Sequence, residues 1–241
     1  LAGISGYGTK AVQEGKTIFI PNAIDCAGFT FDPAKREKLR EELGLTDALI
    51  IGHVGRFHYA KNHEYLLRVF AELCRMSAGA GDSTAETGAD QNYHLILLGE
   101  GPLMEDTRKL AEELDMADRV HFLGNHKNIA DYYQVMDYFV YPSRYEGMPG
   151  TIVEAQASGL PCLMSDTICR EVIVTELVET MSIEKEPKVW AEELQRRMDA
   201  LVSKQENREK YAAKMAAAGF DVQAQAERMM RFYESGRWEN E

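Results

Sequence analysis

Two glutamates bracket the segment Glu146-Gly147-Met148-Pro149-Gly150-Thr151-Ile152-Val153-Glu154, in which they lie eight residues apart. The apolar run Tyr138–Pro142 before the segment is typical of a buried strand, and the residues from Thr151 to Ser158 have helical character. Gly159 and Pro161 then end the predicted helix. The segment therefore predicts a strand, a loop and a helix, with one carboxylate on the loop and the other about a turn into the helix.

The loop between the two carboxylates leads into a helix N-terminus, where free N–H groups and the helix dipole attract anions. Carboxylates accept hydrogen bonds from hydroxyl groups. A nucleotide sugar carries ribose hydroxyls on one side of its diphosphate and sugar hydroxyls on the other. It would therefore suit a site with a carboxylate on each side of an anion-binding helix end. The segment predicts a site for a ligand of this kind.

The same order of strand, loop and helix repeats along the chain. Apolar runs predict strands at 17–20, 48–54, 93–98, 120–123, 138–141 and 161–164. Helices are predicted from Asp32 and Pro33 to Leu43, at 103–114, and after Asn62, which is expected to cap its helix. This alternation predicts an α/β fold with a Rossmann-like parallel sheet covered by helices on both faces. Ligands of such sheets bind beyond the carboxyl ends of the strands.

Two segments depart from this alternation. Residues from Ser77 to Asn92 include no apolar residue larger than alanine, which predicts a mobile surface insertion. The stretch from Trp190 to Trp238 is predicted to be helical and amphipathic, with an apolar end around Met229 and Tyr233. Its final helix is expected to pack on this domain, or otherwise on a domain outside the sequence.

The composition narrows the class of protein. The formal charge of -12 argues against a nucleic-acid binder, which would present a basic face. Four cysteines without a C-x-x-C pair predict reduced thiols and a cytoplasmic protein. No apolar stretch reaches the ~18–20 residues that span a bilayer. The chain begins with Leu1 rather than Met, so it is expected to be part of a longer protein.

Three further loops carry polar groups at the predicted carboxyl edge. Arg56 and Lys61 follow one strand and could bind phosphate, or could be ordinary surface cations. Gly99 and Gly101 form a G-x-G turn, but Met104 occupies the third glycine position of a dinucleotide fingerprint. Residues 123–129 could contact a base edge, or could simply connect two elements.

The histidines give little indication of a metal site. His53, His58 and His63 recur every five residues, which is neither a helical metal pair nor the period of a strand. The sequence has neither a G-x-S-x-G elbow nor a phosphate-binding P-loop. Nucleophilic hydrolysis and ATP use are therefore not predicted.

These loops, in this order, resemble the C-terminal half of the retaining GT-B glycosyltransferases of family 4, the group 1 sugar transferases. The matching pieces are residues 20–25, 54–56 with 61–62, 97–102, 120–124, 142–147 with 154–155, and 158–161. The resemblance runs from about Thr17 to Val178. The sequence around Met181 to Trp190 is similar to that of capsular and exopolysaccharide enzymes.

In that family the C-terminal domain binds the nucleotide-sugar donor. The resemblance implies that Arg56 and Lys61 bind the diphosphate, that Glu154 accepts hydrogen bonds from the ribose, and that Glu146 contacts the donor sugar. Arg56, Lys61 and Glu146 are the implied catalytic residues. The other implied donor contacts are Gly55, Gly101, Asn128, Ile129, Gly147, Met148, Pro149, Gly150, Thr151, Ile152 and Val153.

The resemblance also implies hexosyl transfer from a nucleoside diphosphate sugar to a glycan or lipid-linked acceptor. UDP is the favoured base, with GDP and ADP open, and neither a metal nor another cofactor is expected, because the two cations take the metal's place. Residues 1–16 are expected to be a remnant of a linker or preceding domain, and 17–241 the donor-binding domain with its helical tail. The acceptor domain would be missing, so the isolated chain is expected to have little activity, and membrane contact would belong to the absent half.

Two departures and two alternatives accompany this interpretation. Ala23 stands where the family often has glycine, and Met148-Pro149 replaces a commoner pair, which would alter sugar preference. One alternative is a stand-alone nucleotide-sugar-binding subunit that needs a partner chain. The other is a nicotinamide-dependent oxidoreductase, which shares the parallel sheet but lacks its glycine fingerprint.

Overall fold

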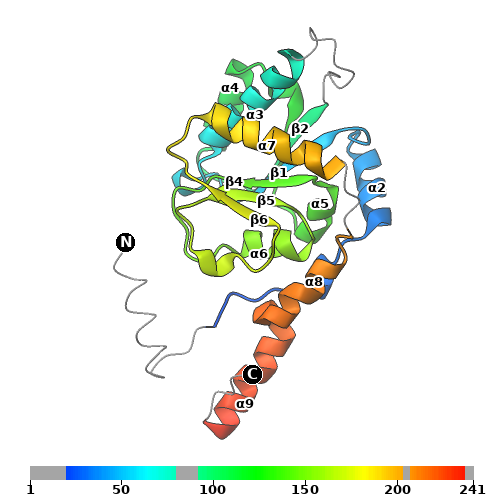
Figure 1. Ribbon diagram of the computed structural model, residues 1–241, viewed down its shortest axis with the longest axis vertical. Coiled ribbons are helices and arrows are strands. Elements are labelled where there is room, and N and C mark those ends of the chain that lie inside the picture. The colour runs from blue at the N-terminus through cyan, green and yellow to red at the C-terminus, as the bar shows by residue number, and fades with distance from the viewer. Residues whose placement is uncertain (1–19, 80–91, 203–206, 237–241) are drawn as a thin grey trace.

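A single parallel sheet organises the chain. The structure is a computed structural model that describes residues 20–79, 92–202 and 207–236. Its six strands follow the order β3-β2-β1-β4-β5-β6 (Figure 1). They are β1 Leu49–Val54, β2 Tyr93–Leu98, β3 Val120–Gly124, β4 Tyr138–Tyr141, β5 Cys162–Ser165 and β6 Val178–Met181. The predicted α/β class is confirmed.

The register brings the carboxyl ends of neighbouring strands to one edge. Val54 of β1 lies opposite Leu98 of β2, and Leu98 lies opposite Gly124 of β3. The loops that follow these strands therefore begin side by side, as expected for parallel strands. This edge is where the sequence predicted the ligand.

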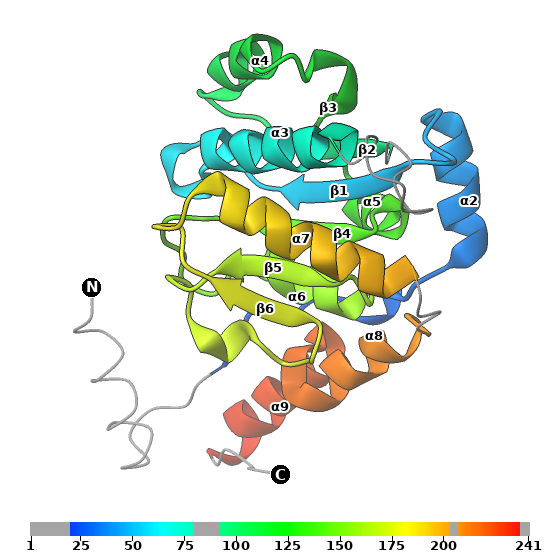
Figure 2. The ribbon, with the colours of Figure 1, turned by 45° about the horizontal axis from the view of Figure 1, so that its top comes forward.

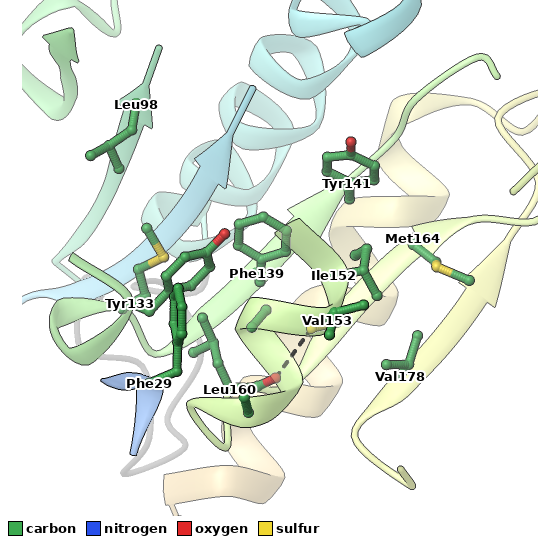
Figure 3. Close-up of a cluster of buried hydrophobic side chains, with 14 of the residues drawn as sticks. Phe29, Leu98, Tyr133, Phe139, Tyr141, Ile152, Val153, Leu160, Met164 and Val178 are labelled. Carbon is green, nitrogen blue, oxygen red and sulfur yellow. Dashed lines mark hydrogen bonds between the residues drawn. The ribbon is translucent and has the colours of Figure 1, made fainter. Parts of the chain in front are cut away.

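Helices cover both faces of the sheet because the central strands are apolar on both sides. The helices α3 His63–Gly79, α4 Met104–Glu113 and α7 Pro187–Val202 pack on one face. On the other lie α5 Ile129–Val135 and α6 Gly150–Ala157, with α2 Pro33–Glu42 outside α5 and α8 Lys210–Met215 outside α6. Figure 2 shows α3 and α7 side by side over the strands. Each face has its own apolar cluster, and Figure 3 shows the one beneath α5 and α6.

The structure corrects three sequence predictions. The strand β6 was missed, and Ile20, the last residue of the predicted strand at 17–20, is not in a strand, while 17–19 lie outside the described residues. The predicted insertion from Ser77 begins too early, because α3 continues to Gly79, and residues 80–91 lie outside the described part. Asn62 precedes α3, but its side-chain oxygen makes no capping hydrogen bond.

The helical tail consists of three helices rather than one amphipathic stretch. After α7 and α8 the chain bends at Gly219, whose φ is 86°, and continues as α9 Val222–Ser235. No residue of α9 is buried, and Tyr233 is 75% exposed. In Figure 1, α9 points away from the sheet. Gln225 of α9 nevertheless donates to the carbonyl of Pro21 at 2.8 Å, and the expectation that the final helix packs on this domain stays a prediction.

Three arginines join distant parts of the chain around Asp137. Arg36 and Arg40 form ion pairs with the Asp137 carboxylate at 2.5 and 3.2 Å. Arg36 also donates to the carbonyl oxygens of residues 134–136, at the end of α5. Arg208 lies just before α8 and donates to the carbonyl oxygens of Met136, Ser158 and Tyr133. These bonds attach α2 and α8 to the core.

Within the described ranges no helix combines the length and the apolar character that crossing a bilayer requires.

Candidate functional site

A cavity of about 660 Å³ opens at the carboxyl edge of β1, β2 and β3. Its lining residues are Val54, Gly55, Arg56, Leu98, Gly99, Glu100, Gly101, Gly124, Asn125, His126, Ile129, Thr151 and Glu154. They come from the ends of β1, β2 and β3 with the loops that follow, from Ile129 at the start of α5, and from Thr151 and Glu154 of α6. The N-terminal end of a helix such as α6 attracts anions. The cavity therefore lies where the sequence predicted a site.

Close contacts between backbones form one wall of the cavity. The N–H of Phe57 donates to the carbonyl of Glu100, and the N–H of Gly99 donates to that of Gly124. A Cβ on Gly101 would lie 2.4 Å from the Phe57 oxygen, and one on Gly99 would lie 2.2 Å from the Gly55 oxygen. Glycine is therefore required at both positions for the loops to pack together. The G-x-G turn serves loop packing.

Arg56 provides an unpaired positive charge at the cavity. Its side chain is exposed, and its guanidinium makes no ion pair with any residue in the described part of the chain. A planar guanidinium can donate two parallel hydrogen bonds to phosphate oxygens. Arg56 is thus available to an anionic ligand.

Lys61, in contrast, already has partners. Its ammonium lies 2.7 Å from a carboxylate oxygen of Glu146 and donates a short hydrogen bond to the hydroxyl of Tyr141. Burial lowers the pKa of Lys61, but the hydroxyl of Tyr141 and the carboxylate of Glu146 outweigh it, so that the pKa is raised overall. Lys61 is therefore held as a cation, next to the first of the two glutamates.

The second glutamate, Glu154, is on α6 and lines the cavity. Burial raises its pKa, although a hydrogen bond of 2.8 Å from the hydroxyl of Tyr133 partly opposes this effect. Tyr133 is fully buried between α5 and α6, with its ring against Phe29 and Phe139. The carboxylate is thus fixed in direction and able to accept further hydrogen bonds from a ligand.

The loop between the two glutamates is tied to other elements through its carbonyl groups. The thiol of Cys169 donates to the oxygen of Gly147 at 3.0 Å, and the amide of Asn22 donates to that of Met148 at 3.1 Å. Since the peptide bond is trans, the N–H of Met148 points opposite to the Gly147 carbonyl. That N–H has no hydrogen-bond partner among the described residues. The loop is therefore held in place with the N–H of Met148 available to donate to a ligand.

Comparison with protein families gives one match that covers most of the chain. Residues 35–218 match the model of the family described as "Glycosyl transferases group 1". The chain belongs to this family.

Curated relatives agree with this assignment. The chain is 34% identical over 229 residues to the putative glycosyltransferase EpsF of Bacillus subtilis, which covers 94% of this chain and 56% of EpsF. It is 30% identical over 236 residues to the lipopolysaccharide core biosynthesis mannosyltransferase LpsB of Rhizobium meliloti, covering 94% of this chain and 63% of LpsB. This group 1 chain thus spans little more than half the length of these relatives.

Solved structures share the fold. A structure of Anabaena Alr3699/HepE in complex with UDP and glucose superposes with a TM-score of 0.69 at 19% identity, over 92% of this chain and 57% of that one. The sheet and its helices are accordingly those of one half of a GT-B glycosyltransferase.

The structure brings only some of the predicted contacts to the cavity. Gly55, Arg56, Gly101, Ile129, Thr151 and Glu154 line it, whereas Lys61, Asn128, Glu146, Gly147, Met148, Pro149, Gly150, Ile152 and Val153 do not. Ile152 and Val153 are fully buried, so only their backbone remains for a ligand. Asn128 instead donates to Asp131 at 2.6 Å, and its neighbours Asn125 and His126 face the cavity.

Several residues of the site were not singled out from the sequence. Glu100, Asn125 and His126 lie in loops that were identified, but nothing distinguished them within those loops. Tyr133 and Tyr141 lie in apolar runs, where an aromatic residue predicts only core packing. The hydroxyl of a buried tyrosine usually has a hydrogen-bond partner. That rule is the one indication in the sequence that Tyr133 and Tyr141 could contact polar groups.

The histidines of the β1 loop region have structural roles. His53 and His63 are buried, with ring centres 4.7 Å apart, and His53 contacts the carbonyl of Val140 through Nδ1. Among the described residues no group of three metal-ligating side chains is gathered in one place.

Proposed function

We propose that this chain is the donor-binding half of a retaining glycosyltransferase that uses a nucleoside diphosphate sugar, with UDP as the favoured nucleotide. The observation that carries the proposal is the arrangement around the cavity: an unpaired guanidinium at Arg56, the N-terminus of α6, and the oriented carboxylate of Glu154. A diphosphate fits the first two groups, and ribose hydroxyls fit the third. UDP in the HepE structure supports the choice of nucleotide for a protein of the same fold.

The reaction would place negative charge on the departing diphosphate when the bond between the sugar and its phosphate breaks. Arg56 lines the cavity and Lys61 follows it on the same loop, so both cations would stabilise that charge once Glu146 has released Lys61. Glu146, which is paired with Lys61 in the free chain, would turn to the hydroxyls of the donor sugar. In this scheme the two cations do the work for which other transferases use a metal ion.

The acceptor would be a glycan or a lipid-linked glycan, bound by a second half of the protein. The lengths of EpsF and LpsB leave room for such a half. We therefore expect hexosyl transfer by the two halves together, and weak or no transfer by this chain alone. The alternative, a stand-alone binding subunit that works with a partner chain, would show the same donor binding but would regain activity when a separate partner is added.

Thermal unfolding with UDP, GDP, ADP and NAD tests donor binding. A ligand at a hundred times its Kd stabilises the folded chain by roughly 2.7 kcal/mol. We expect one nucleoside diphosphate to stabilise the chain, and Glu154→Gln to weaken its affinity about tenfold, because a charged acceptor for the ribose is lost. Glu113→Gln, an exposed carboxylate on α4 that does not line the cavity, is the control.

Three outcomes would contradict the proposal or a part of it. Stabilisation by NAD and by no nucleoside diphosphate would favour the oxidoreductase alternative. Equal affinity of wild type and Glu154→Gln for the preferred nucleotide would show that the cavity does not bind ribose through this carboxylate. Full transferase turnover by the 241-residue chain alone would remove the need for a second half.

A further inference from the structure

We propose that Tyr141 is a positioning residue, whose hydroxyl holds the Lys61 ammonium where a diphosphate needs it. The inference rests on the proposed function, because it assigns Lys61 to the phosphates. It adds a residue whose place in an apolar strand gives no sign of a role beyond packing.

The geometry around Tyr141 connects the core with the site. Tyr141 is the last residue of β4 and is fully buried. Figure 3 shows its hydroxyl on the side of the ring turned away from Ile152 and Val153 of α6. That hydroxyl accepts the hydrogen bond from Lys61, and the ammonium lies 4.8 Å from the centre of the Tyr141 ring. The ring therefore contacts the apolar core while its polar tip contacts the cation.

Tyr141 is itself held in place by its neighbours. Its ring stacks on His53 at 5.3 Å and on Phe139 at 5.9 Å. His53 is fixed in turn by its contact with the Val140 carbonyl at 2.9 Å. A Cβ on Gly55 would lie 3.1 Å from Cδ of Lys61, so the glycine leaves room for the lysine side chain to pass. The hydroxyl is thus a fixed point, with little freedom for either partner.

The two partners of Lys61 differ in charge, and this difference decides their roles. Glu146 is anionic, so it competes with a diphosphate for the ammonium. The Tyr141 hydroxyl is neutral, and burial raises the pKa of this phenol, which keeps its proton. A neutral acceptor can remain bonded to the ammonium while phosphate oxygens replace Glu146. Placing a charge before the ligand arrives avoids the cost of ordering it during binding.

Tyr141→Phe separates this role from packing, because it removes only the hydroxyl. We expect the affinity for UDP to fall about three- to tenfold, as for the loss of one hydrogen bond. The affinity for uridine, which has no phosphate, should not change. Tyr138→Phe is the matched control, because Tyr138 is buried on the same strand but packs in the cluster on the other face. Calorimetric titration, or competition for weak ligands, measures both affinities.

A double-mutant cycle locates the effect. In a Lys61→Gln background, Tyr141→Phe should cause no further loss of UDP affinity, because the two residues act through one contact. Equal losses for UDP and uridine, additive losses in the cycle, or no loss for either ligand would overturn the proposal.

A measurement without ligand keeps this inference distinct from the proposed function. In a ¹⁵N–¹H spectrum of lysine ammonium groups, we expect a Lys61 signal that disappears in Tyr141→Phe and remains in Tyr138→Phe. Should the variant fail to fold, cross-relaxation between the Lys61 ammonium and the Tyr141 ring in the wild type gives the same information. No contact in the wild type, or an unchanged signal in Tyr141→Phe, would overturn the inference. A contact in a chain that binds no nucleotide would overturn the proposed function, and with it the role for a diphosphate, but would leave Tyr141 as the residue that positions Lys61.

Discussion

The ion pair between Lys61 and Glu146 should weaken the binding of a nucleoside diphosphate that lacks its sugar. Under the proposed function, a nucleoside diphosphate without its sugar would offer Glu146 no hexose hydroxyl, yet it would still need the ammonium that Glu146 holds at 2.7 Å. For such a ligand the carboxylate acts only as a competitor and as a repulsive charge.

We therefore predict that Glu146→Gln increases the affinity for UDP about three- to tenfold, while it lowers transfer in a protein that contains both halves. Calorimetric titration with UDP measures the first effect, and Glu113→Gln on α4 is the control for a change in net charge. A weaker affinity for UDP in Glu146→Gln would show that the glutamate supports the ammonium rather than competing for it.

Among individual residues, the sequence predicted the charged groups at the cavity better than the tyrosines that bond to charged groups. Arg56 and Glu154, which line the cavity, were singled out from their places after a strand and at the start of a helix, together with the family resemblance. Tyr133 and Tyr141 could not, since their hydroxyls act on residues 21 and 80 positions away in the sequence. Only the folded sheet shows which buried tyrosine meets a charge.

At the scale of elements, the turn after β2 is held against the turn after β1 without intervening side chains. We predict that Gly101→Ala destabilises the chain by about 1–3 kcal/mol, because the added methyl would meet the Phe57 carbonyl at 2.4 Å. Urea unfolding measures the loss, and UDP affinity should fall with it. Gly147→Ala, where a Cβ meets nothing within 4 Å, should unfold at nearly the same urea concentration as wild type.

The contact between β1 and α3 makes stability depend on pH. Burial lowers the pKa of His53 to about 4 and that of His63 to about 2. In the unfolded chain both imidazoles bind protons below about pH 6.5, whereas the folded chain keeps them neutral, so stability is lost as the pH falls from 6.5 towards 4. The expected slope is about 1.4 kcal/mol per pH unit for each histidine.

His63→Phe tests this source of the pH dependence. Both ring nitrogens of His63 lack partners, and its ring stacks on Phe57 at 4.1 Å, so phenylalanine should fit the same space. We expect urea unfolding at pH 7.5 to change little and the slope between pH 6.5 and 4.5 to fall by about half. An unchanged slope would place the acid sensitivity elsewhere, and the exposed His58→Asn is the control.

The elements themselves were largely predictable from hydrophobic pattern. The strands β1, β2, β4 and β5 were found because they are buried on both faces and their residues are nearly all apolar. The edge strand β3 has only Val120 buried, and it was found from its apolar residues Val120, Phe122 and Leu123. β6 was missed because it is an edge strand in which only Val178 is buried, and the sequence Val-Glu-Thr-Met gives too short a pattern. Since β3 is also an edge strand with one buried residue, it is the polar pair Glu179 and Thr180 that hid β6.

At the scale of the whole molecule, Arg208 attaches the end of the chain to the sheet domain. We predict that Arg208→Met destabilises the chain by about 1–3 kcal/mol, because three backbone carbonyls lose their donor. Hydrogen exchange in α8 should accelerate more than exchange in β1. Lys210→Met, at an exposed position two residues later, is the control. Equal exchange in α8 for Arg208→Met and wild type would show that packing alone holds this helix.

The arrangement of the tail could not be predicted from sequence. Amphipathic periodicity identified helices after Trp190, but periodicity does not say what a helix packs against. The bonds of Arg208 reach carbonyls 50 to 75 residues away, and carbonyls leave no trace in the amino-acid sequence. The same limit applies to α9, on which Val222, Met230 and Tyr233 are exposed.

The wall built by Gly99 and Gly101 restricts how this site can diverge among related proteins. Because that wall consists of main chain, no side chain there can be replaced by one of another size or charge. A change of ligand preference would have to come from lining side chains instead, such as those of Asn125 and His126 after β3. The backbone wall could thus stay the same in related proteins that bind different ligands.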